Sequence, residues 1–324
     1  MLKNIRVIGI IVTYNGSSFI ENCLNSLKKD MDEKDIIVID NGSKDATVAI
    51  IEEKYTGVRL IRQVRNSGFG KANNIGLQMA VLENADYVFL LNQDVYVEEH
   101  SVRRLVDISG LYPEYGILSP MHLNGNGTAL DNHFAGYVAG ALVSDLYLGR
   151  RARIYPCYFV NAAAWLISKR CLETVGGFDP LYFHYGEDDD YLNRVRYFKM
   201  KIGVCPGVRI YHDRGPVNAL STYPPVYKMH LEILKRLTNI NSPFFRTVAE
   251  LLLQLLCNMI VCLVLLQFKN IYRMQKVFFS MVFRLNRIRL ARIESKTRFA
   301  FLKLEGPTPL PSQHNLHRSA PTPL

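Results

Sequence analysis

Short apolar runs that end in polar turns recur along the first third of the chain. These runs are rich in β-branched side chains, as are strands buried in a parallel sheet. They cover residues 5–12, 36–40, 58–64 and 86–92. Apolar residues at helical spacing predict helices between the strands, over 19–27 and 71–82. This alternation predicts an α/β fold: a Rossmann-like, mainly parallel sheet covered by helices on both faces.

Polar segments follow the predicted strands at the edge where such sheets bind ligands. They are residues 13–15, Asp40, the turn at 66–70 and Asp94. The turn NSGFGKANNIG has two glycines but lacks the third glycine of a dinucleotide fingerprint and the Walker lysine, so it does not support an NAD site or a P-loop. Its backbone N–H groups, exposed at a helix start, suit a nucleotide or its phosphates. A plain strand-to-helix turn is the alternative.

Asp94 and His212 are candidates for a metal and phosphate site. A single carboxylate at a strand end can simply cap a turn, but it can also hold Mg²⁺ or Mn²⁺ against a diphosphate. His212 ends the segment 201–212, which reads as a pair of strands. A lone histidine is commonly a plain surface or core residue; here it is equally a candidate for metal or phosphate contact.

The run GEDDD (186–190) places four consecutive carboxylates at the start of a predicted helix. Acidic groups there interact favourably with the helix dipole, typically by up to about 1 kcal/mol each. Four in a row exceed any capping need, because their mutual repulsion must be offset by cations, hydrogen bonds or raised pKa values. Asp190 can pair with Arg194 one turn later. The others remain candidates for a general base.

Positive charge is concentrated in the last third of the chain. Residues 1–214 carry a net charge of −1, and the rest carries +11. This asymmetry predicts an acidic partner for the C-terminal region. A basic nucleic-acid binder would fit the charge, but the acidic cluster and the lack of an aromatic–basic platform argue against nucleic acid as a partner.

The C-terminal region also predicts contact with a membrane. Residues 250–268 are almost wholly apolar and close to the minimum length for crossing a bilayer. Beyond them, cationic residues (Arg273, Lys276, Arg284 and Arg287) and apolar residues (Ile271, Met274, Phe278, Met281 and Leu285) fall on separate helical faces, as in a helix lying on an anionic membrane. A helical hairpin packed on the first domain is the alternative.

Three segments are predicted from these patterns. Residues 1–220 form the α/β domain, 221–304 a basic and apolar helical extension associated with the membrane, and 305–324 a disordered Pro/Ser-rich tail. The six cysteines show neither C-x-x-C pairing nor zinc spacing, so we expect reduced thiols in a cytosolic setting.

The stretches IVTYN, VIDNGSKDA, NSGFGKANNIG, LLNQDV and VGGFDPLYFHYGEDDDYLNR, followed by His212, together resemble the family 2 glycosyltransferases of the GT-A fold. They are most similar to the bacterial subgroup that assembles surface polysaccharides and includes rhamnosyltransferases. The resemblance covers roughly residues 5–215. It implies a hexosyltransferase-type enzyme that moves a sugar, possibly rhamnose, with inversion from a nucleoside-diphosphate donor of the dTDP or UDP type.

The resemblance also implies roles for single residues. The nucleotide-sugar contacts would be Thr13, Tyr14, Asn15, Asp40, Asn66, Gly68, Gly70, Lys71, Asn92 and Gln93. Asp94 and His212 would hold Mg²⁺ or Mn²⁺. Asp188 would be the general base, supported by the acidic neighbours Glu187 and Asp190. One departure concerns the metal motif, because Asn92 stands where the family commonly has its first aspartate.

The expected acceptor is a growing, lipid-linked glycan at the cytoplasmic face of the bacterial inner membrane. Residues expected on the acceptor side are Asn161, Trp165 and Asp131, with His133 as a further candidate. The competing interpretation is a non-catalytic nucleotide-sugar-binding or scaffold subunit of a polysaccharide assembly complex. Retention of Asp94, Asp188 and His212 together argues against that interpretation.

Overall fold

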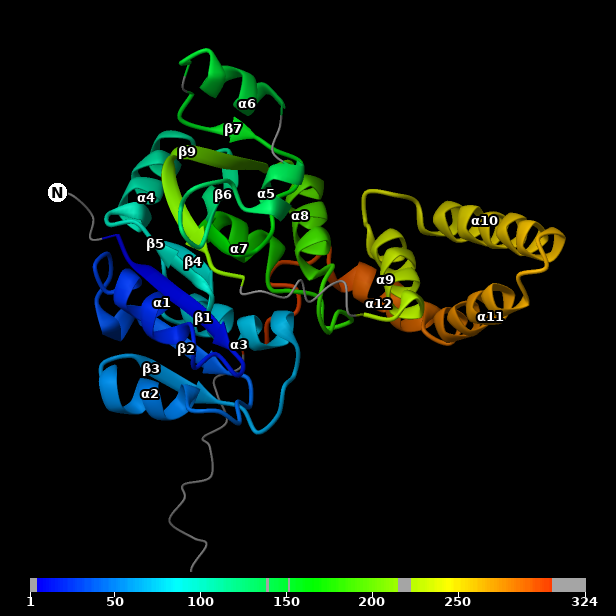
Figure 1. Ribbon diagram of the computed structural model, residues 1–324, viewed down its shortest axis with the longest axis horizontal. Helices are drawn as coiled ribbons and strands as arrows, with labels where there is room; N and C mark the ends of the chain where they lie inside the picture. The colour runs from blue at the N-terminus through cyan, green and yellow to red at the C-terminus, as the bar shows by residue number, and fades with distance from the viewer. Residues whose placement is uncertain (1–4, 138–139, 151, 215–222, 305–324) are drawn as a thin grey trace, which may run out of the picture.

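A nine-stranded sheet forms the centre of the molecule (Figure 1). The computed structural model describes residues 5–137, 140–150, 152–214 and 223–304. The strand order is β3-β2-β1-β4-β8-β6-β9-β5, and β7 pairs with β9. The strands are β1 Val7–Thr13, β2 Ile36–Asp40, β3 Arg59–Arg62, β4 Tyr87–Asn92, β5 Val95–Val97, β6 Tyr115–Asn124, β7 Tyr155–Pro156, β8 Ala164–Ser168 and β9 Lys201–His212.

The helices lie between and after these strands. In the first 214 residues they are α1 Ile20–Leu27, η1 Glu33–Asp35 (a 3-10 turn), α2 Thr47–Lys54, α3 Phe69–Leu82, α4 Ser101–Leu111, α5 Asn132–Tyr137, α6 Gly140–Tyr147, α7 Lys169–Val175 and α8 Glu187–Tyr197. The C-terminal helices are α9 Pro225–Thr238, α10 Phe244–Val264, α11 Phe268–Val282 and α12 Leu285–Glu294.

The sheet is parallel in its first half and mixed in its second. Strands β3, β2, β1 and β4 all run parallel, so their carboxyl ends meet at one edge. Strand β8 runs antiparallel to β4 and β6, and β5 runs antiparallel to β9. The register places Thr13 beside Asp40 and Val12 beside Asn92. The predicted ligand residues of three strands therefore lie side by side.

Side-chain alternation along the strands builds a separate core on each face of the sheet. Ile10 and Ile39 face a core that includes residues of α3, α7 and α8. Ile11 and Val38 face a core that includes residues of α1, α2 and α4. The predicted α/β sheet with helices on both faces is confirmed.

The four C-terminal helices form an arm that projects from the α8 side of the domain (Figure 1). A third apolar cluster holds the arm together and contains Leu234 and Leu237 of α9, Val277 and Met281 of α11, and Ile288 of α12. The arm is attached to the domain at its base, because Tyr182 belongs to the same cluster.

The chain returns to the α/β domain after α12. The Gly177 amide donates to the Ala300 carbonyl over 2.7 Å, and the Phe299 amide donates to the Glu173 carbonyl over 3.0 Å. The Phe301 ring lies 5.2 Å from the guanidinium of Arg194. Residues close to the C-terminal end of the described chain therefore complete the packing around α7 and α8.

Several predicted elements differ from the observed ones. Residues 201–212 form one continuous strand, β9, because they pair with β6 along most of their length. The apolar face predicted for a helix on the membrane belongs to α11. Met281 on this face packs in the cluster shared with α9, and Met274 is also buried. The proposed tail 305–324 and the proposed boundary at residue 220 lie outside the described residues. All six cysteines are free thiols.

Candidate functional site

Gln93 joins the ends of β1 and β4 at the ligand edge of the sheet. Its side-chain oxygen accepts hydrogen bonds from the Thr13 hydroxyl over 2.6 Å and from the Tyr14 amide over 2.9 Å. Its amide nitrogen donates to the Tyr14 carbonyl over 3.3 Å. Tyr14 is 41% exposed, so its ring is available to a ligand above this junction.

The turn after β2 is organised by Asp40. This carboxylate is buried and accepts hydrogen bonds from the backbone amides of Gly42, at 3.3 Å, and Ser43, at 3.2 Å. Ser43 in turn accepts a bond from the Asn15 amide over 2.9 Å, while the Asn15 side chain accepts from the Lys44 amide. The polar turns after β1 and β2 therefore form one hydrogen-bonded unit.

Two asparagines shape the glycine-rich turn. The Asn41 side chain donates to the Asn66 side-chain oxygen over 3.0 Å, and Asn66 accepts from the Gly68 amide over 2.9 Å. Gly68 has φ of +93°, a region that favours glycine, and a Cβ there would lie 2.3 Å from the Phe183 carbonyl oxygen. Gly70 opens α3 against Phe178. The turn can therefore hold its tight path only with glycine at residue 68.

Asp94 and His212 meet where β5 pairs with β9. The register places Val95 opposite His212, and Asp94 Oδ2 lies 3.4 Å from His212 Nε2. The Asp94 side chain is 25% exposed, whereas His212 is buried. Asn92 lies at the end of β4, and its buried side-chain oxygen has no hydrogen-bond partner among the described residues.

This arrangement fits a divalent cation bound together with a diphosphate. Mg²⁺ is commonly held by one or two carboxylates plus substrate phosphates and water. Asp94 supplies a carboxylate oxygen that reaches solvent, and His212 supplies an imidazole nitrogen beside it. In the described part of the chain, no cluster of three or more His, Cys, Asp or Glu side chains could hold a metal by itself. Phosphate oxygens would have to complete the coordination.

Asp131 and Arg214 form a clamp behind His212. Arg214 donates from Nε and Nη2 to the two carboxylate oxygens of Asp131, the second bond measuring 3.1 Å. Asp131 Oδ2 also lies 4.0 Å from His212 Nδ1. Burial raises the pKa of Asp131, but the bonds from Arg214 and the Phe134 amide outweigh it and lower the pKa overall. Asp131 is 3% exposed, as is His212, and its place on the acceptor side remains a prediction.

The acidic run at the start of α8 separates into groups with different surroundings. Asp188 is partly exposed, and its side chain accepts a bond from the Asp189 amide over 2.9 Å. Burial raises the pKa of Asp188 to about 7, and the charge of Asp189 contributes to this shift. Glu187 is 5% exposed; burial, with the charge of Asp188, raises its pKa to about 8. Asp188 therefore combines access with the pKa that a base needs near neutral pH.

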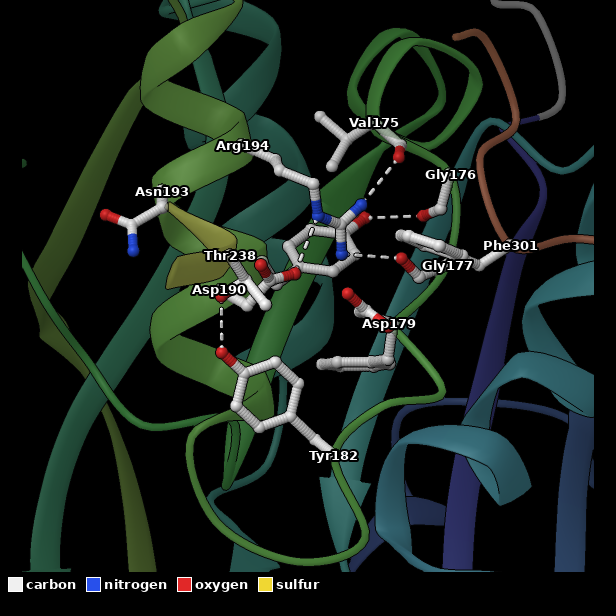
Figure 2. A network of polar contacts seen from close by, with 12 residues as sticks. Val175, Gly176, Gly177, Asp179, Tyr182, Asp190, Asn193, Arg194, Thr238 and Phe301 are labelled. Carbon is white, nitrogen blue, oxygen red and sulfur yellow. Dashed lines mark hydrogen bonds and ion pairs between the residues drawn. The ribbon is translucent and has the colours of Figure 1, made fainter. Parts of the chain in front are cut away.

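Asp190 has a structural role inside α8. Figure 2 shows its carboxylate facing Arg194, whose Nε donates to it over 2.8 Å. The same guanidinium donates to the carbonyls of Val175 over 2.8 Å and Gly177 over 2.7 Å. Both charged side chains are at most 1% exposed. The predicted pairing of Asp190 with Arg194 is confirmed, and burial removes Asp190 from contact with a substrate.

A second buried carboxyl adjoins this pair. Asp179 lies in the loop before α8, close to Arg194 and Asp190 (Figure 2). It accepts a hydrogen bond from the Leu181 amide over 2.8 Å. Burial raises the pKa of Asp179 to about 7, and the negative charge of Asp190 acts in the same direction. Asp179 is buried near the Asp190 carboxylate and has no ion pair of its own among the described residues, which favours a proton on Asp179.

The loop between α7 and α8 connects the glycine-rich turn at residues 66–70 with the start of α8. The Asn74 side chain bonds both backbone groups of Phe178, with distances of 2.7 and 2.8 Å. The Phe69 amide donates to the Phe183 carbonyl over 3.2 Å. Arg194 binds the beginning of this loop, and Asp188 follows its end. The glycine-rich turn and Asp188 are consequently held in one framework.

The residues predicted on the acceptor side have different environments. Asn161 is partly exposed and accepts a hydrogen bond from the Tyr137 hydroxyl over 2.6 Å. Trp165 is fully buried in β8 between Phe178 and Tyr191, so it cannot contact an acceptor in this structure. Its position follows from alternation in β8, which turns its side chain into the core.

Sequence reasoning found one of the residues that orient the site, Arg194, through its predicted pairing with Asp190, and overlooked the others. Asn41, Asn74, Arg194 and Arg214 each bond a segment distant in sequence. Arg194 left a signal, because an arginine one turn after an acidic helix start predicts an ion pair. The others carry no local pattern that separates them from surface residues.

Comparisons with known proteins agree with this architecture. Residues 10–133 match the family described as Glycosyl transferase family 2. Two curated relatives cover most of the chain. The low-salt glycan biosynthesis hexosyltransferase Agl10 of Haloferax volcanii is 24% identical over 254 residues, which are 76% of this chain and 79% of the relative. The N-acetylglucosaminyl-diphospho-decaprenol L-rhamnosyltransferase of Mycobacterium tuberculosis is 26% identical over 231 residues, 64% and 75% of the two chains.

Solved structures share the fold at low sequence identity. TarS 1–349 of S. aureus in complex with UDP-GlcNAc has a TM-score of 0.53 at 16% identity, covering 75% of this chain and 69% of TarS. GalNAc-T7 with UDP, GalNAc and Mn²⁺ also has a TM-score of 0.53 at 16% identity, covering 72% and 50%. These similarities show the GT-A fold.

Proposed function

We propose that this chain, whose residues 10–133 match Glycosyl transferase family 2, transfers a sugar with inversion from a nucleoside-diphosphate donor to a hydroxyl of a lipid-linked glycan. The observation that carries this proposal is Asp188, which is partly exposed and has a raised pKa. The loop before α8 connects it to the glycine-rich turn at residues 66–70. Rhamnose, moved by the mycobacterial relative according to its name, is the sugar we propose.

Asp188 would act as the general base. Its carboxylate accepts the proton of the acceptor hydroxyl as the oxygen attacks the anomeric carbon of the donor. The bond from that carbon to the diphosphate oxygen breaks at the same time, and its electron pair leaves on the diphosphate. Attack from the face opposite the leaving group inverts the anomeric centre. A base with a pKa close to ambient pH suits this proton transfer.

The donor would lie across the ends of β1, β2 and β4. Thr13, Tyr14 and Asn15 would line the nucleotide pocket, and Asp40 would accept a hydrogen bond from the base. Asn66, Gly68, Gly70 and Lys71 would close over the nucleotide, with Asn92 and Gln93 beside it. Asp94 and His212 would hold Mg²⁺ or Mn²⁺, which neutralises negative charge on the departing diphosphate.

The acceptor side would be lined by Asn161, next to Tyr137. A lipid-linked acceptor is supported by the decaprenol named for the mycobacterial relative, and by an apolar helix, α10, long enough to cross a membrane. We propose that the protein works at the cytoplasmic face of the membrane, as a peripheral or weakly anchored enzyme.

Replacing Asp188 with Asn tests the proposal directly. We expect Asp188→Asn to lower kcat by at least about 10³-fold, because general-base catalysis contributes on this order. Donor binding, measured by calorimetry with UDP and dTDP, should stay within about twofold. The wild-type rate should rise as pH increases through about 7, since only the deprotonated carboxylate can accept the proton.

Asp213→Asn is the matched control, because Asp213 is an exposed aspartate outside the acidic run. We expect that variant to keep its turnover. Unchanged turnover in Asp188→Asn would refute the base assignment. Absence of transfer by the wild-type protein with every donor, despite nucleotide binding, would favour the alternative of a non-catalytic scaffold subunit.

A further inference from the structure

The arm exposes an unusual amount of apolar surface on α10. The helix is 21 residues long, yet only 6% of its most apolar window is buried within the structure. Its exposed large apolar residues are Phe245, Leu252, Leu253, Leu256, Ile260, Val261, Leu263 and Val264; the following turn adds Leu265 and Leu266, and α11 begins with the exposed Phe268. This surface runs along the helix and is far larger than isolated exposed side chains would produce.

The apolar cluster of the arm covers only the first turns of α10, which also packs on α11. Phe244, Val248 and Leu251 pack against the apolar cluster of the arm. Arg236 of α9 donates to the Gln254 side chain over 2.6 Å. Beyond that point the helix extends away from α9 toward the turn that leads into α11 (Figure 1). The face of α10 from Leu256 onward is consequently left uncovered by the residues that the structure describes.

The companion helix α11 carries cations that remain free to bind anions. Lys269, Arg273 and Lys276 lie one turn apart along α11, and the two lysines are exposed. Among the described residues, none of the three forms an ion pair with a carboxylate. Apolar side chains beside unpaired cations match the chemistry of an anionic lipid surface, where acyl chains lie beneath phosphate headgroups.

The hairpin geometry excludes a simple crossing by α10. A helix of this length would extend about 31 Å, enough to cross the hydrocarbon core. However, only three residues separate the end of α10 from the start of α11, and the two helices pack on each other. If α10 crossed the bilayer, α11 would return beside it and carry Arg273 and Lys276 into the hydrocarbon. Charged groups at that depth are strongly unfavourable.

We propose that the α10–α11 hairpin lies along one leaflet of an anionic membrane, with the outer face of α10 in the acyl-chain boundary and the α11 cations at the phosphates. This inference goes beyond sugar transfer, because it assigns the depth and direction of the membrane contact. The occupant of the α10 face is lipid. Pairing of two chains through α10 and a full crossing are the outcomes that would overturn it.

Depth measurements on the full chain test the proposal. Spin labels are placed at residues 252 and 263, on the same face of α10, in a Cys257→Ser/Cys262→Ser background. The protein is then bound to vesicles of phosphatidylglycerol and phosphatidylethanolamine. We expect both labels at the same shallow depth. An upright crossing would separate them by about 16 Å along the membrane normal and would overturn the proposal.

Binding measurements provide the second test. Leu256→Asp should weaken sedimentation with the same vesicles by at least tenfold, whereas Leu111→Asp, at an exposed apolar position on the α/β domain, should not. Lys269→Gln/Lys276→Gln should reduce binding to anionic vesicles and leave the weaker binding to phosphatidylcholine unchanged. Failure of the wild-type chain to bind vesicles, or a stable dimer that Leu256→Asp dissociates, would refute lipid as the occupant.

These readouts need no sugar transfer. Loss of membrane binding with intact catalysis would overturn the hairpin proposal alone. Loss of catalysis in Asp188→Asn with intact membrane binding concerns the proposed function alone. The two proposals can therefore fail separately.

Discussion

At the scale of single residues, burial separates side chains of the same chemical type. Asp188 is partly exposed, whereas Asp190, two positions later, is 1% exposed and bound to Arg194. Asp94 reaches solvent beside His212, whereas Asp131 is closed off behind the same imidazole. The functional assignment of a carboxylate in this protein depends on which of these two environments it occupies.

Asp94 should control metal affinity. We expect Asp94→Asn to weaken Mn²⁺ binding in the presence of UDP by at least about tenfold, because the amide removes the charged oxygen that faces solvent near His212. Binding can be followed from the free-Mn²⁺ signal in electron paramagnetic resonance, independently of turnover. Asp213→Asn, beside His212 in sequence, should bind normally. Equal affinity in both variants would contradict the proposed site.

Sequence patterns identified these residues better than they identified their surroundings. Asp94 and Asp40 were predicted because local periodicity locates strand ends, and parallel strands bring those ends together. The contact of Asp131 with Arg214 was not predicted, because the two residues lie 83 positions apart in sequence. Trp165 was misplaced because a bulky aromatic in a short apolar run can face either side of a strand until its pairing is known.

At the scale of elements, one arginine sets the position of α8, the helix that carries Asp188. Arg194 connects α8 to the end of α7 and to the loop that follows it. Thr238 of α9 lies beside the same network and bonds the Tyr182 hydroxyl over 2.6 Å (Figure 2). The register of α8, and with it the location of Asp188, therefore depends on contacts at the buried side of the helix.

Removing this arginine should destabilise the whole domain. We expect Arg194→Met to lower the free energy of unfolding by about 3–5 kcal/mol, since it leaves Asp190 buried without a counter-charge. Chemical denaturation measures the change. Arg298→Met, which removes an arginine paired with Glu173 and 69% exposed, should cost at most about 1 kcal/mol. Similar losses in the two variants would show that the buried pair has no special role.

The element scale also shows what one face of α11 contacts. Its amphipathic pattern was interpreted as a membrane face, but the apolar side that contains Val277 and Met281 packs on α9. Periodicity reports that a helix has an apolar face and leaves the chemistry of its partner undetermined. Only the tertiary arrangement distinguishes a protein partner from lipid, and it leaves the apolar side chains of α10 exposed.

At the scale of the whole molecule, the arm and the α/β domain are interdependent. Arg292 of α12 donates to the carbonyls of Leu237, Asn239 and Ser242, which fixes the base of the arm. Asn241 donates to the Asn193 carbonyl of α8 over 2.8 Å. Residues 299–302 then pack beside α7 and α8. A division into a self-sufficient catalytic domain and a separable membrane extension does not describe these contacts.

Truncation after residue 245 should therefore unfold or inactivate the enzyme in addition to releasing it from membranes. The deletion removes Phe301 and the Ala300 carbonyl, which cover Arg194 and Gly177. A shorter excision of residues 255–276, bridged by a Gly/Ser linker, should keep the melting temperature and lose only membrane binding. Thermal unfolding of the three proteins checks this. A fragment 1–245 as stable as the full chain would contradict the prediction.

The double attachment of the arm has a consequence for acceptor selection. The arm is bonded to α8 at its base, and residues 299–302 attach the chain to the α/β domain a second time. These two attachments restrict rotation of the arm relative to the domain. If the hairpin rests in one leaflet, the doubly attached arm holds Asp188 at a constant distance from the lipid surface. A hydroxyl close to the membrane anchor would then come within reach, and one added several sugars later would lie too far out. The enzyme would select an acceptor hydroxyl by its distance from the membrane surface.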